Sequence, residues 1–179
     1  MRRRGLTIDV FKATGVSLRR DIMAMEDAGA RNSLIFTDLG VVTTTRANGP
    51  ALTRTMLTEL AANKPDVIVF ELGDGLLGTY GVQSILRQPD IKAVLTCVAL
   101  SANDPVAAWG GVKLLRERFG IEPSVVTGPA TDNQVGVEII REQMNVEAFN
   151  AISNPADLGD HIISKLPLRN VGESKVAGE

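Results

Sequence analysis

The sequence predicts an α/β domain with a doubly wound, mostly parallel sheet and helices on both faces. Short apolar runs rich in β-branched residues recur along the chain, and each is nearly continuous rather than alternating. Such runs are typical of strands that are covered on both faces. Segments with helical spacing of apolar residues separate them. The expected strands are TIDVFK, SLIFTD, DVIVFEL, KAVLTCVAL, PSVVTG and EAFNAIS.

The helices are placed by apolar stripes and by residues that favour helix ends. We expect helices at 16–28, from Pro50 onward, from Pro105 to Gly120, at 131–144 and at 155–166. Proline favours the first turn of a helix, and glycine favours the position just after its end. Short polar residues favour the amino-terminal cap. The expected caps are Asn103 or Asp104, Thr131 or Asp132, and Asn154.

Length and composition indicate one compact domain over residues 1–168. The chain has 179 residues, of which 44% are hydrophobic and 22% charged, so a single core needs no disulfide or structural metal. The lone Cys97 lies in an apolar run, and we interpret it as a small buried hydrophobic residue. The last residues, 169–179, have little to bury, so we expect a flexible tail.

Charge and hydropathy exclude several partners. The formal net charge is −2, which gives no electrostatic reason to expect DNA or RNA binding. Apolar runs stay well short of the roughly 20 residues that a membrane span needs, and the first residues lack the apolar core of a signal peptide. We therefore expect a cytoplasmic protein with no membrane partner.

Polar residues gather where the expected strands end. Because the carboxyl ends of parallel strands meet at one edge of a sheet, ligands of open α/β sheets bind there. The same residue types also suit turns and helix caps, and that ordinary role is the alternative for most of them. They are Lys12, Thr14, Gly15, Asp38, Thr43, Thr44, Thr45, Glu71, Asp74, Ser101, Asn103, Asp104, Thr127, Gly128 and Thr131.

Two carboxylates stand out in the segment FELGDGLLGTYG. Glu71 directly follows a strand that is expected to be buried, so its charge needs a cationic partner. Mg²⁺ is commonly held by one or two carboxylates together with phosphate oxygens, which makes Glu71 and Asp74 the candidate metal ligands. The alternative is an ion pair between Glu71 and Lys12, and the two interpretations are compatible if the metal arrives with a nucleotide.

A lysine in the segment FKATGVSLRRD is a candidate phosphate ligand. Lys12 ends a strand, and the Thr14–Gly15 turn leads into a helix whose first backbone N–H groups favour an anion. A lysine that merely extends from the strand end to solvent is the alternative. Further along, Arg19, Arg20 and Asp21 suit a solvated helix face, although they could also reach the ligand.

The segments ELGDGLL, KATG and DAGA…FTDLGVVTTT resemble the P-loop nucleotide hydrolase superfamily. The similarity is to the branch of dethiobiotin synthetase and the domain family of unknown function 1611, and it spans Gly5 to about Leu166. In that branch a glycine-rich loop follows a strand, and its glutamate takes part in binding Mg²⁺ and nucleotide phosphate. The resemblance matches that glutamate to Glu71 and the loop glycines to Gly73 and Gly75. It also matches the family's lysine and Thr-Gly turn to Lys12, Thr14 and Gly15.

The sequence departs from that superfamily in one respect. The phosphate loop G-x-x-x-x-G-K-[ST] does not occur in the 179 residues. In the family a strand, this loop and a helix precede the segment that matches GLTIDVFKATG, so RRRG resembles the last turn of that helix. We therefore expect an N-terminally truncated domain, through a misplaced start, a trimmed chain or genuine degeneration. We expect this domain to be inactive alone and to self-associate, with a homodimer as the candidate assembly.

The resemblance implies an ATP- and Mg²⁺-dependent, ligase- or kinase-like ancestry with a small metabolite as the second substrate. The expected catalytic residues are Lys12, Glu71 and Asp38, and the expected nucleotide-binding residues are Thr14, Gly15, Gly73, Gly75, Asn103 and Thr127. Two alternatives stay open. One is an N-acetyltransferase that acts on a D-amino acid, and the other is a non-catalytic binding or scaffold domain that has lost its phosphate loop.

Overall fold

The computed structural model describes residues 1–167, and the chain divides into two compact units. The first unit comprises Met1–Val94, and the second begins at Leu95. Each unit has its own cluster of buried apolar residues, so we describe the single domain expected at 1–168 as two units. The tail expected at 169–179 lies outside the described residues.

The first unit is a parallel sheet with helical connections. Its strands are β1 (Ile8–Thr14), β2 (Asn32–Ile35) and β3 (Val67–Leu72). Its helices are α1 (Arg19–Asp27), α2 (Gly49–Ala62), α3 (Val82–Leu86) and α4 (Pro89–Ala93), with 3₁₀ turns at Arg2–Arg4 and Phe36–Leu39. The RRRG segment thus forms one helical turn, and it closes at Gly5 with a φ of 79°.

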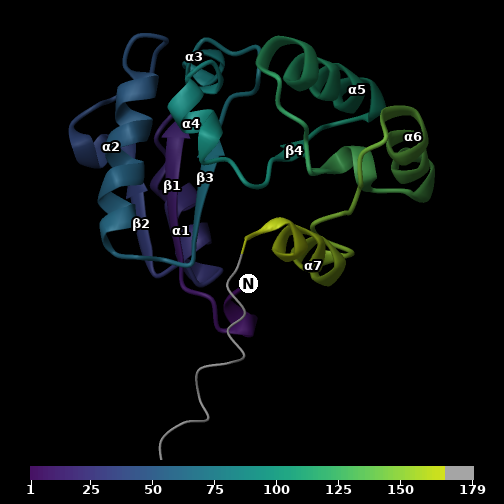
Figure 1. Cartoon of the computed structure of the whole chain (residues 1–179), viewed down its shortest axis with the longest axis horizontal. Helices are drawn as coiled ribbons and strands as arrows, with labels where there is room; N and C mark the ends of the chain where they lie inside the picture. Colours follow the sequence, from purple (N-terminus) through teal and green to yellow (C-terminus); the bar gives the residue numbers. More distant parts are fainter. Residues whose placement is uncertain (168–179) are drawn as a thin grey trace, which may run out of the picture. The chain divides into compact units, whose positions relative to one another are not determined.

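Strand β1 lies at the centre of this sheet, between β2 and β3, and pairs in parallel with both (Figure 1). Its position explains why its residues are almost all buried. Phe11 is in register with Phe70 of β3, and their rings stack on one face with centroids 5.0 Å apart. Lys12 and Glu71 are the next pair in register, so the alternation of side chains turns both toward the opposite face.

Two helices pack against the first sheet, but β3, which was expected to be buried, is only partly covered, and its Val69 is 43% exposed. Helix α1 packs against β1 and β2, while α2 packs against β1 and β3. Met56 and Leu60 of α2 are fully buried in one cluster with Phe11, as their helical spacing predicts. The helix expected at 16–28 begins only at Arg19, because Val16 instead forms a bridge to Thr43.

The second unit contains a parallel pair of strands with helices around it. Its strands are β4 (Ala99–Ser101) and β5 (Val125–Thr127). Its helices are α5 (Pro105–Leu114), a π-helical extension at Leu115–Phe119, a 3₁₀ turn at Pro129–Thr131, α6 (Gln134–Met144) and α7 (Pro155–Lys165). Asp104 caps α5 as expected, since its side chain accepts a hydrogen bond from the backbone N–H of Ala107 at 2.8 Å.

Three local expectations are wrong in this part of the chain. The run KAVLTCVAL forms a strand only from Ala99, because Pro89 starts a helix that includes its first two residues. The run EAFNAIS makes a single bridge at Ala148, because the Asn150 side chain accepts backbone hydrogen bonds and closes a turn. Helix α6 is capped by Asn133 rather than by Thr131 or Asp132.

The expected α/β class is confirmed, with small parallel sheets and helical connections. Cys97 is a free cysteine of intermediate exposure, so the expectation that it is buried is wrong. Within residues 1–167, no helix combines the length and the apolar character that crossing a membrane requires.

Candidate functional site

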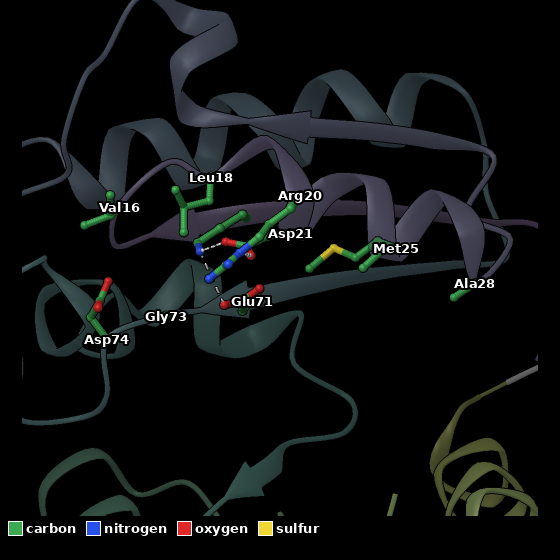
Figure 2. A pocket seen from close by; sticks show the side chains of 11 residues that line it. Val16, Leu18, Arg20, Asp21, Met25, Ala28, Glu71, Gly73 and Asp74 are labelled. Atoms are coloured by element: carbon green, nitrogen blue, oxygen red, sulfur yellow. Dashed lines mark hydrogen bonds and ion pairs between the residues drawn. The ribbon is translucent and has the colours of Figure 1, made fainter. Parts of the chain in front are cut away.

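A pocket of about 630 Å³ opens in the first unit, between α1 and the end of β3 (Figure 2). One part of its wall is apolar and comes from α1 and the turn before it: Val16, Leu18, Ala24, Met25 and Ala28. The other part carries charged side chains from three different segments: Lys12, Arg20, Asp21, Glu71 and Asp74. The pocket therefore offers an apolar wall beside a charged one, as small-molecule sites commonly do.

Lys12 is the central charged residue of this wall. Its side chain is only 8% exposed, and its Nζ donates a hydrogen bond to Asp21 Oδ2 at 2.5 Å. The same nitrogen lies 3.7 Å from Glu71 Oε1. Figure 2 shows Asp21 and Glu71 approaching from α1 and β3. The buried ammonium group is thus neutralised by two carboxylates that come from elements on either side of it.

The backbone explains how these groups meet. Lys12 and Glu71 are paired residues of adjacent parallel strands, so their side chains leave the sheet on the same face. Asp21 lies in the first turn of α1, which begins a few residues after β1 ends. A lysine near the end of the central strand therefore faces both the neighbouring strand and the start of the next helix.

The glycine-rich loop after β3 packs directly on the turn after β1. Thr14 Oγ1 donates a hydrogen bond to the carbonyl oxygen of Gly73 at 3.0 Å. A Cβ atom at Gly73 would lie 3.0 Å from the Thr14 carbonyl oxygen and 3.1 Å from Glu71 Oε1. At Gly15, where φ is 103°, a Cβ atom would collide with the Asp74 carboxylate. Gly15 is favoured by its positive φ, and a side chain at Gly73 would require the neighbouring atoms to move by a few tenths of an ångström.

The Asp74 backbone adopts a conformation that favours glycine, with φ at 66°. Non-glycine residues in this region cost roughly 1–3 kcal/mol and cluster at ligand sites. The side chain nevertheless lines the pocket, so a carboxylate is held at a position where glycine is the less strained residue. Aspartate tolerates this region better than most non-glycine residues, so an ordinary turn also accounts for the backbone conformation.

The pocket lining contains carboxylate oxygens, which are the type of ligand that hard divalent cations prefer, but the described residues do not group them into a metal site. Its lining has three carboxylates against two cationic groups, so it carries an acidic surplus. Carboxylate oxygens are the ligands that Mg²⁺ prefers, and one or two of them suffice when phosphate and water complete the coordination shell. Among residues 1–167 no group of three or more His, Cys, Asp or Glu side chains could hold a metal ion.

Six of the residues predicted as catalytic, nucleotide-binding or metal-binding lie outside the pocket lining, and two of them, Thr14 and Gly15, lie against the loop that borders it. Asp38 is exposed and its carboxylate accepts a hydrogen bond from the backbone N–H of Ile35, which closes a 3₁₀ turn. Gly75 is exposed and has a φ of 76°, as a turn glycine requires. Asn103 and Thr127 belong to the second unit, where Asn103 precedes α5 and Thr127 ends β5.

Thr127 has a feature that its sequence does not suggest. Its Oγ1 atom is buried and has no hydrogen-bond partner among the described residues, which is uncommon for a buried polar atom.

Asp21 is expected from the sequence on a solvated helix face, whereas in the structure it is the nearest counter-ion of Lys12. A usable signal is the position of an acidic residue in the first turn of the helix that follows a strand ending in lysine. Arg20 lies beside it with Nε 3.8 Å from Asp21 Oδ1, and its side chain is 82% exposed, as expected for a solvated helix face.

Comparison of the chain with protein-family models, with curated proteins and with solved structures found no match.

Proposed function

We propose that this chain is a nucleotide-binding domain of the P-loop NTPase type, with a doubly wound sheet and an ATP- and Mg²⁺-dependent, ligase- or kinase-like ancestry. The nucleotide phosphates bind at the charged wall of the pocket. The observation that carries the proposal is the buried ammonium group of Lys12, which lies near the carboxyl end of β1 beside the glycine-rich loop.

The position of Lys12 supports a role in phosphate binding. Ligands of open parallel sheets bind at the carboxyl ends of the strands, and Lys12 lies near that end of the central strand. An ammonium group has three donor hydrogens, and Asp21 uses one of them. Lys12 therefore keeps donors for an anionic group that enters the pocket.

Glu71 and Asp74 are the residues that would hold Mg²⁺. Both line the pocket, and the side chain of Glu71 is 41% exposed. When bound, the metal supplies charge neutralisation for the phosphates. The acidic surplus of the wall repels a nucleotide that arrives without a cation, so nucleotide binding requires the metal.

The resemblance noted in the sequence supports the same assignment. The two segments that carry it, KATG and ELGDGLL, are far apart in the chain but lie in contact through Thr14 and Gly73. We propose that the second substrate is a small metabolite that binds beside the apolar wall of the pocket.

The experiment is a calorimetric titration of the whole chain with MgCl₂, with ATP, and with both together. We expect binding only when both are present, and we expect Glu71→Gln to weaken it at least tenfold, the lower range for loss of a charged contact. Glu59→Gln is the matched control, because Glu59 is an exposed residue of α2 outside the pocket.

Other outcomes would redirect the assignment. Unchanged binding in Glu71→Gln would remove that residue from the site. Binding of acetyl-CoA in place of Mg²⁺ and ATP would favour an acetyltransferase, and binding of neither would favour a non-catalytic domain.

A further inference from the structure

The ammonium group of Lys12 lies unevenly between its two carboxylates. Its Nζ is 2.5 Å from Asp21 Oδ2 but 3.7 Å from Glu71 Oε1. The first distance is a direct hydrogen bond, whereas the second exceeds hydrogen-bond length. Lys12 is therefore held on the α1 side of the pocket and away from β3.

The two carboxylates also differ in their surroundings. Asp21 is 24% exposed and has a cation near each oxygen, with Lys12 at Oδ2 and Arg20 Nε at Oδ1. Glu71 is 41% exposed, and its contact with the ammonium group is the long one. Asp21 thus acts as the counter-ion of Lys12, while the Glu71 carboxylate remains accessible from the pocket.

We propose that Asp21 is a positioning residue that holds Lys12 away from Glu71 and so keeps the Glu71 carboxylate available for the metal ion. This inference rests on the proposed function for its metal, although its geometric part does not. Asp21 touches neither metal nor nucleotide in this scheme. It acts only through the lysine.

The burial of Lys12 explains why the loss of Asp21 would move the ammonium group. Lys12 is only 6% exposed, and a buried ammonium group without a counter-ion is strongly unfavourable. If Asp21 loses its charge, the nearest remaining carboxylate is Glu71. The ammonium group then closes the 3.7 Å gap, forms a direct ion pair with Glu71 and competes with the metal for that carboxylate.

The first test reads the position of Lys12 without any ligand. A carbodiimide joins an amine to a carboxylate that lies in contact with it, and mass spectrometry of the digested protein identifies the joined pair. In the wild-type chain we expect Lys12 linked mainly to Asp21. In Asp21→Asn we expect the Lys12–Glu71 link to become the main product, and an unchanged yield of that link would overturn the proposal.

The second test measures metal affinity. We titrate MgCl₂ into the chain at a saturating ATP concentration and compare wild type, Asp21→Asn and the control Asp27→Asn. Asp27 is an exposed residue at the end of the same helix and lies outside the pocket lining. We expect Asp21→Asn to weaken Mg²⁺ binding about 10- to 100-fold, as loss of an outer partner of a metal ligand does, and Asp27→Asn to leave it unchanged.

A double variant separates positioning from a general structural effect. In Lys12→Met/Asp21→Asn the lysine that would occupy Glu71 is absent, so the affinity for Mg²⁺, measured at an ATP concentration that saturates each variant, should recover relative to Asp21→Asn. Failure to recover would overturn the proposal. Absence of Mg²⁺ and ATP binding in the wild type would instead refute the proposed function, and the cross-link would still decide where Asp21 holds Lys12.

Discussion

The central strand β1 carries a buried charged residue toward each of its ends, and the two are satisfied in different ways. Asp9, toward the amino end, is fully buried, and Lys12, toward the carboxyl end, is nearly so. Asp9 receives hydrogen bonds from fixed donors on both of its oxygens. Lys12 has one short contact and one long contact, and it borders a pocket.

In the cluster around Asp9, both carboxylate oxygens already accept hydrogen bonds from neighbouring residues, and we call this cluster closed. Arg31 donates to both carboxylate oxygens of Asp9, at 3.0 and 2.9 Å, and Asn32 donates to one of them at 3.1 Å. Burial alone raises the pKa of Asp9, but these hydrogen bonds and the charge of Arg31 outweigh it and hold the pKa below the ordinary value of 3.8. Such a group is typical of a structural ion pair.

In the cluster around Lys12, the ammonium group borders a pocket and has one short and one long carboxylate contact, and we call this cluster open. Its carboxylates come from α1 and β3, and the pocket brings a further carboxylate, Asp74, to the same wall. Groups whose hydrogen-bonding capacity is not used within the fold can use it on a ligand. Burial of a charged group therefore does not indicate function by itself. A buried charged group that borders a pocket and has unused hydrogen-bonding capacity does indicate a functional site.

The largest expected effect on stability is at the closed cluster. Arg31→Met removes the main partner of Asp9, and a buried charge left without its counter-ion costs about 3–5 kcal/mol. We expect a large fall in the urea midpoint of unfolding, with nucleotide binding retained under conditions where the variant is folded. A variant as stable as the wild type would contradict the structural role of this pair.

The next largest effect is expected at the open cluster, where the substitution should weaken nucleotide binding and change stability little. We expect Lys12→Met to weaken nucleotide binding about 10- to 100-fold, as loss of a charge-assisted contact does, and to reduce the salt dependence of binding. Its stability should change by less than about 1 kcal/mol, because Asp21 and Glu71 remain in contact with water. Calorimetry at two salt concentrations and urea unfolding check both parts.

The opposite result for Lys12→Met would contradict the distinction between a structural Asp9 and a ligand-binding Lys12. If Lys12→Met lowered stability but left binding untouched, then Lys12 would be a packing residue, and both ends of β1 would be structural.

The smallest expected effect concerns a solvated pair that serves as a reference for the buried Asp9. Arg54 donates two hydrogen bonds to Asp90 and lowers the pKa of that carboxyl from 3.8 to about 2. Between pH 3.8 and 2 the folded chain keeps Asp90 ionised while the unfolded chain binds a proton. Stability is therefore present above this window and is lost as the pH falls through it.

Asp90→Asn removes this contribution, so the variant should lose less stability than the wild type between pH 7 and pH 3. Urea unfolding at both pH values measures the difference. The variant should still be acid-sensitive, because Asp9 and Asp66 also have lowered pKa values. Equal losses in the two proteins would show that Asp90 does not contribute.

Prediction from the sequence succeeded where local patterns decide the structure. The continuous apolar runs at β1, β2 and β3 became parallel strands, and Pro50 and Pro105 became first-turn residues of α2 and α5. It failed at EAFNAIS, where the Asn150 side chain accepts two backbone hydrogen bonds and closes a turn in place of a strand. Short polar side chains compete locally with strand pairing, and composition does not reveal which interaction prevails.

The candidate site divides in the same way. Lys12, Glu71 and Asp74 were predicted from their places at strand ends, and the structure brings all three to one pocket. Asp38 has the same kind of sequence position, yet its carboxylate accepts a hydrogen bond from Ile35 within its own turn. Strand ends select for both ligand-binding and turn-forming residues, so the sequence did not separate them.

The sequence by itself determined the α/β class, the three strands of the first sheet, and the positions of Lys12 and Glu71 near the carboxyl ends of β1 and β3. Periodicity and turn chemistry are local properties, so they can be interpreted along the chain. Only the tertiary structure decided that Asp21 is the nearest partner of Lys12 and that Asp9 is matched by Arg31. Ion pairs depend on distances of a few ångströms between segments, and these distances are set by how helices and strands pack.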